Sequence, residues 1–220
     1  MPPQPLVYRA DAVSLTTLPA GTVLWRFHES RFAAESFAPP REDPFFTGYR
    51  FDGTRLYPYP YYYAADRADT ALAEVLLRQR RFDPGRTERL IGHHEVAGRR
   101  LSAVETTADL RLANLVSALD LSRLGQDEWL LEASGAEQIQ TRVWAGQLWE
   151  AEERVQGMLW MSRRNRPERA LLLFGDRCGE DFLKPLPDET LDFDSARGVE
   201  RANDLLEGFA AAIVPPPSLA

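Results

Sequence analysis

The sequence predicts one α+β domain, in which strands and helices contribute to a single hydrophobic core. Several short apolar runs have the two-residue alternation of strands, and longer segments repeat apolar residues every three to four positions, as helices do. The 220 residues are enough to build one core, and no linker-like stretch divides the chain. We therefore expect a single domain over residues 1–220.

The composition is that of an ordinary globular protein. Hydrophobic residues make up 44% of the chain and charged residues 27%. A net charge of −7 argues against binding to nucleic acid or to an acidic membrane surface, because both require a basic face. No apolar run approaches the roughly 18 residues of a membrane span, and the first residues lack the features of a signal peptide. We expect a cytoplasmic protein.

Cysteine and histidine are scarce. Cys178 is the only cysteine, which rules out an internal disulfide, and with three histidines, two of them adjacent, a zinc site is not expected. We therefore expect no metal. The basic residues other than histidine are arginines, apart from Lys184, and the planar guanidinium of arginine is the better partner for phosphate.

Two arginines stand in unusual surroundings in the first quarter of the chain. Residues 21–28 predict a strand, and alternation places Arg26 on the face opposite Trp25. A charged residue in so apolar a strand either ends it at the rim of the sheet or points into a polar cleft. Residues 32–53 form a long loop rich in proline, glycine and aromatic residues, which predicts a binding surface around Arg50.

Residues 61–78 predict a buried strand followed by a helix. Asp66 and Asp69 are candidate N-caps, and the helix carries a carboxylate, Glu74, in an otherwise apolar sequence. The spacing alone favours a structural interpretation, in which Glu74 and Arg78 form an exposed i, i+4 pair that contributes little stability. A functional role for Glu74 depends on the segments that accompany it.

The middle of the chain is expected to add two short strands and two helices. Residues 87–107 are interpreted as two strands joined by a Val-Ala-Gly-Arg turn. The pattern over residues 109–124 predicts a helix. A second amphipathic helix is predicted over residues 141–155, with Trp144 on its core-facing side.

The last third of the chain predicts a β-hairpin and a final helix. Apolar runs at residues 158–161 and 170–174 flank a polar turn, which favours a hairpin. Ser162 lies at the end of the first run. It is either an ordinary turn residue or, together with the arginines that follow it, a ligand for phosphate. Residues 183–193 are the loosest stretch, and residues 195–214 predict an amphipathic helix.

Taken in order, four of these segments resemble the RES-domain family, which is named after an arginine, a glutamate and a serine. The matching segments are LWRFH with Arg26, GYRF with Arg50, YAADRADTALAEVL with Tyr63 and Glu74, and LWMSRRN with Ser162. They lie in a core of about residues 21–176, and it is their joint order and spacing that is specific. One segment departs from the family, which usually has Gly-Arg-Trp: here Tyr49 stands between Gly48 and Arg50, and Phe51 replaces the tryptophan.

The resemblance implies a fold like that of the ADP-ribosyltransferase toxins, with a split mixed β-core flanked by helices. Members of the family act as toxins in toxin–antitoxin pairs. They break down NAD+ by phosphorolysis or hydrolysis, or transfer ADP-ribose to a protein. NAD+ is then a substrate rather than a cofactor, inorganic phosphate is a possible co-substrate, and the partner is typically a helix-turn-helix antitoxin.

The resemblance also implies roles for the matching residues. Cleavage of the nicotinamide–ribose bond develops positive charge on the ribose, which the carboxylate of Glu74 would stabilise. Arg26 and Arg50 suit the pyrophosphate, because guanidinium groups bind phosphate with bidentate geometry. Tyr63 offers a ring for nicotinamide and a hydroxyl, and Ser162 can donate to phosphate or ribose.

Other functions stay open. The chain has no Gly-x-Gly-x-x-Gly motif, so a dehydrogenase of the Rossmann type is not expected. A protein ADP-ribosyltransferase would use the same pocket, together with a docking surface such as the loop at residues 32–53. A module that binds NAD+ or a nucleotide without turnover is the other alternative, and homo-oligomerisation is left open.

Overall fold

The computed structural model describes residues 13–43, 48–179 and 181–214. A mixed sheet of eight strands has the order β1-β6-β7-β8-β3-β2-β5-β9, and a separate pair joins β10 to β4. The strands are β1 (Leu15–Leu18), β2 (Val23–Glu29), β3 (Tyr61–Ala65), β4 (Arg89–Gly92), β5 (Arg99–Thr106), β6 (Leu110–Leu115), β7 (Gly157–Met161), β8 (Arg169–Phe174), β9 (Leu183–Asp192) and β10 (Ala211–Val214). The α-helices are α1 (Ala68–Leu76), α2 (Ala118–Arg123), α3 (Trp129–Glu132), α4 (Gln138–Ala151) and α5 (Ala196–Leu206).

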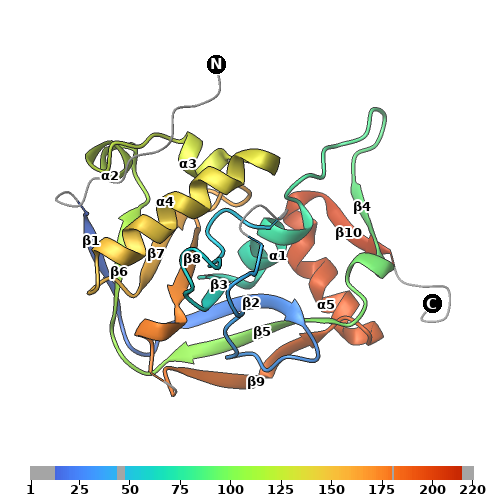
Figure 1. The fold of residues 1–220 in the computed structure, drawn as a ribbon. Helices are drawn as coiled ribbons and strands as arrows, with labels where there is room; N and C mark the ends of the chain where they lie inside the picture. The colour runs from blue at the N-terminus through green and yellow to red at the C-terminus, as the bar shows by residue number, and fades with distance from the viewer. Residues whose placement is uncertain (1–12, 44–47, 180, 215–220) are drawn as a thin grey trace.

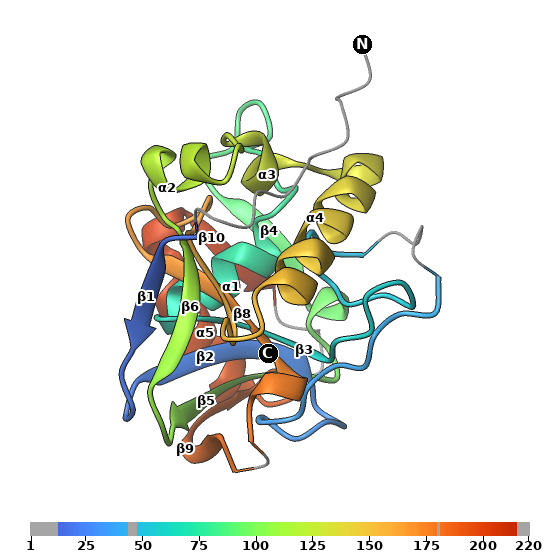
Figure 2. The same cartoon turned by 60° about the vertical axis from the view of Figure 1, so that its left-hand side comes forward.

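Three clusters of buried side chains surround this sheet, which is strongly curled (Figures 1 and 2). Trp144 and Leu148 of α4 pack on the half that contains β7 and β8. Leu72 of α1 and Leu206 of α5 pack on the half that contains β2, β5 and β9. The third cluster consists mostly of strand residues, among them Leu24 of β2 and Leu171 of β8. Among the helices described, none has the length and apolar character needed to cross a bilayer.

The two halves of the sheet meet at β2 and β3, and they are joined there by a single residue pair. Trp25 lies opposite Ala65, whereas β2 pairs with β5 along its whole length and β3 with β8 along its whole length. Beyond this pair β2 and β3 diverge, and an isolated bridge from Ala38 occupies the free edge of Tyr61. The β6–β7 pair is parallel, so the prediction of a split, mixed β-core is confirmed.

Several predicted elements are present at the expected positions. The strand predicted over residues 21–28 is β2, and β1 before it was not predicted. The strand before Glu74 is β3, and the predicted hairpin is formed by β7 and β8, with Met158 opposite Leu172. The helix predicted over residues 141–155 is α4, and Trp144 is fully buried on it. In each of these segments one spacing of apolar residues is strong, and contacts with neighbouring elements do not change the secondary structure that it predicts.

Other elements differ from the prediction. Residues 110–115 are strand β6, whose residues alternate between buried and exposed at its start, and only residues 118–123 are helical. Residues 183–192, expected to be loose, form the long edge strand β9. The predicted turn between β4 and β5 does not make a hairpin, because β4 pairs with β10 instead.

The last predicted helix is shorter than expected. Helix α5 ends at Leu206, and a 3-10 turn leads to Ala210, whose φ of 48° lies in the left-handed region. This reversal directs β10 back along β4 as a parallel partner. The apolar periodicity continues through residues 195–214, so no feature of the sequence indicated this turn. The turn is determined by the pairing of β10 with β4.

Candidate active site

A cavity of about 630 Å³ lies where β2 and β3 diverge, lined also by α1 and by loop residues between 31 and 50. Its charged lining is dominated by six arginines opposed by three glutamates. These side chains are Arg26, Arg31, Arg41, Arg50, Arg78, Arg99, Glu29, Glu74 and Glu95. In a chain of net charge −7 this local excess of positive charge favours an anionic ligand.

Arg26 reaches this cavity from β2 and holds part of the adjacent loop. Its guanidinium donates to the carbonyl oxygens of Ala34, at 3.3 Å, and Ser36. It lies over the ring of Tyr62, with 4.5 Å between Cζ and the ring centroid. Burial lowers the pKa of Arg26 from its ordinary value. Some of its donors are thus committed to the protein itself, so Arg26 supports the wall of the cavity as well as its charge.

Arg50 enters the cavity from the loop and is only 8% exposed. Its Cζ lies 5.9 Å from the ring of Trp160 and 5.8 Å from that of Phe51. Burial lowers the pKa of Arg50 to about 10, and the negative charge of Glu74 opposes this effect, so the side chain stays cationic at neutral pH. Its Nε has no partner among the described residues. A buried donor of this kind is costly unless a ligand satisfies it.

Tyr63 lines the cavity from the middle of β3, but its hydroxyl serves the protein. The hydroxyl oxygen accepts a hydrogen bond from the backbone N–H of Phe51 at 3.0 Å. The ring makes edge contacts with Tyr49 and Trp160, at centroid distances of 5.8 and 6.3 Å. Burial raises the pKa of Tyr63 well above its ordinary value. The face of the ring, rather than the hydroxyl, is what Tyr63 offers to a ligand.

Glu74 lines the same cavity from α1, half-buried, and is held by the hairpin turn. Its Oε1 accepts from the hydroxyl of Ser162 at 2.5 Å and from the backbone N–H of Arg163 at 2.9 Å. The exposed pair between Glu74 and Arg78 is absent from the ion pairs of the described residues, and Arg78 lies over the ring of Tyr49 instead. The structural interpretation of Glu74 as a solvated helix residue is therefore wrong.

Ser162 is fully buried at the end of β7 and does not line the cavity. Its hydroxyl donates to Glu74 and accepts the backbone N–H groups of Arg164, at 3.2 Å, and Asn165, at 3.1 Å. Each bonding capacity of a hydroxyl, one donor and two acceptor lone pairs, is thereby used. In this structure the hydroxyl of Ser162 is committed to Glu74 and to the hairpin turn.

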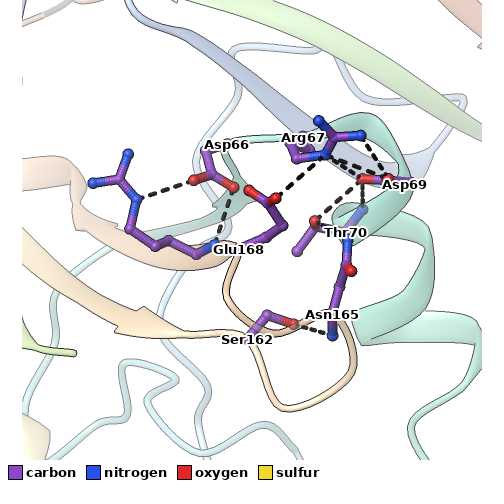
Figure 3. A network of polar contacts seen from close by, with 8 residues as sticks. Asp66, Arg67, Asp69, Thr70, Ser162, Asn165 and Glu168 are labelled. Carbon is purple, nitrogen blue, oxygen red and sulfur yellow. Dashed lines mark hydrogen bonds and ion pairs between the residues drawn. The ribbon is translucent and has the colours of Figure 1, made fainter. Parts of the chain in front are cut away.

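Figure 3 shows the polar network that fixes the helix carrying Glu74 to this turn. The side chain of Asn165 donates to the hydroxyl of Thr70 at 2.8 Å. Asp66 pairs with Arg169 at 3.0 Å instead of capping the helix. The N-cap of α1 is Arg67, and it makes no side-chain cap hydrogen bond, so the predicted aspartate caps are wrong. The bond from Asn165 to Thr70 therefore ties the first turn of α1 to the hairpin turn.

Some residues of the cavity were not predicted as site residues. His28 lies on the same strand face as Arg26, a signal already present in the alternation of β2. Arg78 follows Glu74 by four residues, and the sequence favoured an exposed ion pair between the two rather than a place in the cavity. Arg99 reaches the cavity because it lies opposite Glu29 in the β2–β5 ladder, and nothing in the local sequence encodes that pairing.

His28 is neutral in this setting. Its Nε2 lies 2.9 Å from the hydroxyl of Ser102, and its Nδ1 lies 2.9 Å from the carbonyl oxygen of Glu29, to which it donates. Burial lowers the pKa of His28, and the nearby charge of Arg26 lowers it further. Among the described residues, no group of three or more histidine, cysteine, aspartate or glutamate side chains is placed to hold a metal ion.

Comparisons with known proteins agree with the fold. The sequence model of a family described as "RES domain" matches residues 23–194. A comparison with curated proteins gave no match. Among solved structures, the chain is similar to one described as the crystal structure of the M. tuberculosis MbcT–MbcA toxin–antitoxin complex. The TM-score is 0.54 at 16% sequence identity, and the match covers 80% of this chain and 86% of that chain.

Proposed function

Because this chain belongs to the RES-domain family, we propose that its cavity binds NAD+ and that the protein cleaves the bond between nicotinamide and ribose. The observation that carries this proposal is the position of Glu74. Its carboxylate is oriented by Ser162 and by a backbone N–H, and it faces a cavity rich in arginine. Cleavage of this substrate requires a fixed negative charge beside the ribose and cationic groups that hold the pyrophosphate.

The reaction develops positive charge next to Glu74. When the bond between C1′ of the ribose and the nicotinamide nitrogen breaks, the electron pair leaves with nicotinamide and the ribose acquires oxocarbenium character. The carboxylate of Glu74 stabilises this charge. Water or inorganic phosphate then forms the new bond to C1′, and a water nucleophile releases one proton to the solvent. Ser162 keeps one oxygen of the carboxylate hydrogen-bonded, which holds Glu74 in one orientation.

The arginines supply the ground-state binding. Arg50 has an unsatisfied buried donor, and Arg78 stands beside it over Tyr49. Guanidinium groups bind phosphate oxygens in a bidentate manner, so these two side chains suit the pyrophosphate. Arg26, half committed to the loop, contributes charge and shape. A volume of about 630 Å³ lies within the usual range for ligand pockets of roughly 300–1,000 Å³.

In the cell, we propose that this protein is a cytoplasmic toxin whose activity an antitoxin restrains. Two findings support this proposal: the family to which the chain belongs, and the fold that it shares with a structure of a toxin–antitoxin complex. By the same resemblance the antitoxin is of the helix-turn-helix type.

Transfer of ADP-ribose to a protein is the second candidate reaction. Phe32 and Tyr49 line the cavity and are 48% and 45% exposed, so two large aromatic side chains are available to an acceptor that approaches from outside. Exposed aromatic residues of this kind are frequent anchors of protein interfaces. The chemistry at Glu74 is the same for both reactions, and only the nucleophile differs.

One experiment tests the reaction and identifies the acceptor. Purified protein is incubated with NAD+ alone, with added inorganic phosphate, or with a bacterial protein extract, and nicotinamide release is measured by chromatography. We expect release without any protein acceptor, and the effect of phosphate distinguishes phosphorolysis from hydrolysis. Release that needs the extract supports ADP-ribosyl transfer. If NAD+ binds but no nicotinamide appears under any of the three conditions, the protein is a binding module.

A further inference from the structure

Asp52 is a buried carboxylate directly behind the Arg50 loop. It is 1% exposed and does not line the cavity. Its Oδ2 accepts from the backbone N–H of Tyr49 at 3.0 Å. Its Oδ1 has no partner among the described residues. Burial raises the pKa of Asp52, because desolvation penalises the charged carboxylate.

The hydroxyl of Tyr63 holds the backbone of the same loop on the other side of Arg50. It accepts from the N–H of Phe51 at 3.0 Å. The neighbouring carbonyl oxygen of Arg50 accepts from the hydroxyl of Thr141 at 2.7 Å. The loop is therefore tied on both sides of Arg50, from β3 and from α4, by bonds that do not depend on regular secondary structure.

Resting on the function proposed above, we infer that Asp52 and the Tyr63 hydroxyl are positioning residues that hold the Arg50 guanidinium at the pyrophosphate of the substrate. Loops of this kind are mobile unless their backbone groups are bonded, and a displacement of about 1 Å weakens a bidentate contact strongly. Here the main chain on either side of Arg50 is fixed by the carboxylate of Asp52, which does not line the cavity, and by the hydroxyl of Tyr63, which is already bonded to the protein. The Tyr49 insertion and Phe51, which depart from the usual motif, lie inside this bonded unit.

Tyr63→Phe and Asp52→Asn test this inference, because each keeps the shape of the side chain. We expect either variant to raise the KM for NAD+ about tenfold, with kcat within twofold, since only ground-state binding by Arg50 is weakened. Tyr57→Phe is the matched control, because this tyrosine packs against the same core cluster without facing the cavity, and it should leave both constants unchanged.

A double-mutant cycle separates positioning from a direct contact with the substrate. In an Arg50→Ala background, Tyr63→Phe should add less than twofold to KM, because the side chain that it positions is gone. If the two effects multiply instead, Tyr63 acts on the substrate independently of Arg50 and the inference is wrong. An unchanged KM in both single variants also overturns it.

Binding measurements distinguish this failure from failure of the proposed function. If the wild-type protein binds NAD+ in calorimetry but releases no nicotinamide, the proposed reaction is wrong, and the same variants are compared by their dissociation constants. The expected tenfold weakening then still tests the role of Asp52 and Tyr63. Absence of NAD+ binding by the wild-type protein overturns both proposals. Should Asp52→Asn fail to fold, Tyr63→Phe carries the test alone.

Discussion

At the scale of single residues, the carboxylate of Glu74 is the group on which the proposed chemistry depends. Glu74→Gln keeps the size and the hydrogen-bond acceptor but removes the charge, so it should lower kcat about a hundred- to thousandfold, since one preorganised electrostatic contact contributes roughly 3–4 kcal/mol. The affinity for NAD+ should hardly change, because the stabilised charge exists only in the transition state. Calorimetry measures the affinity for NAD+, and a turnover assay measures kcat. Activity within threefold of wild type would contradict the mechanism.

In the proposed mechanism Ser162 acts through Glu74, with which it shares a hydrogen bond of 2.5 Å. Ser162→Ala should therefore lower kcat by about tenfold, less than the loss of the charge itself, and leave KM nearly unchanged. Ser195→Ala is a suitable control, because the Ser195 hydroxyl caps α5 far from this bond and its loss affects stability alone. A rise in KM with kcat unchanged would show that Ser162 contacts the substrate after all.

The two arginines of the motif should differ in their effect on substrate binding. Arg50 has a buried donor without a partner among the described residues, whereas Arg26 already donates to the loop carbonyl of Ala34. We expect Arg50→Ala to raise KM more than Arg26→Ala does, and Arg26→Ala to lower the melting temperature more. The sequence alone favours the opposite order, since it places Arg26 on a strand and Arg50 on a loop. Equal effects of both substitutions on KM would place the phosphates elsewhere.

The sequence was sufficient to predict several of the residues that belong to the candidate site, but not the role that each of them has there. The order of the motifs was sufficient to select Glu74 and Arg26, and the structure places both on one cavity. Burial was not predictable: Ser162 follows an apolar strand and precedes two arginines, a pattern that suits a phosphate ligand equally well. Asp52 gave no signal, because a carboxylate in a polar loop is ordinarily exposed.

At the scale of elements, β2 carries a histidine whose protonation is coupled to folding. The pKa of His28 is lowered in the folded state, whereas the unfolded chain takes up a proton near pH 6.5. Below that pH the unfolded state binds more protons, so stability that is fully present above about pH 6.5 is lost as the pH falls toward the lowered pKa. Denaturant unfolding of the wild-type protein at pH 7.5 and 5.5 should show this loss.

Two variants separate this contribution from that of other groups. His28→Gln should reduce the difference in the free energy of unfolding between pH 7.5 and 5.5. His94→Gln serves as the control, since His94 is exposed and should leave that difference unchanged. An identical pH dependence in the wild type and His28→Gln would show that the ring of His28 is not coupled to folding in this range.

Helices and strands were predictable where one hydrophobic periodicity dominates the segment. They were not predictable where pairing with a distant strand determines the structure. Helix α4 and the hairpin of β7 and β8 follow from their own residues. Strand β6 was read as helix because its leucines, with those of the following helix α2, also satisfy a helical spacing. Strands β9 and β10 form only because β5 and β4 offer them partners, and that information is spread over distant parts of the chain.

At the scale of the whole molecule, loss of NAD+ should be visible in a living host. Expression of the wild-type chain alone should slow bacterial growth and lower intracellular NAD+, because redox metabolism depends on it. Glu74→Gln, expressed to the same soluble level, should do neither. Growth curves beside an NAD+ assay measure both effects. Equal slowing by the two proteins would show that the growth defect is independent of this carboxylate.

The single pair that joins the two halves of the sheet has a mechanical consequence. Trp25 and Ala65 form the vertex of a V whose arms are β2 and β3, and the ligand cavity lies between the arms. Arg26 stands on one arm and Tyr63 on the other. A rotation of one half about this vertex displaces groups in proportion to their distance from it, so a small repacking beside Ala65 becomes a larger movement at the mouth. The separation of β2 and β3 at the mouth of the cavity thus depends on the packing around the Trp25–Ala65 pair.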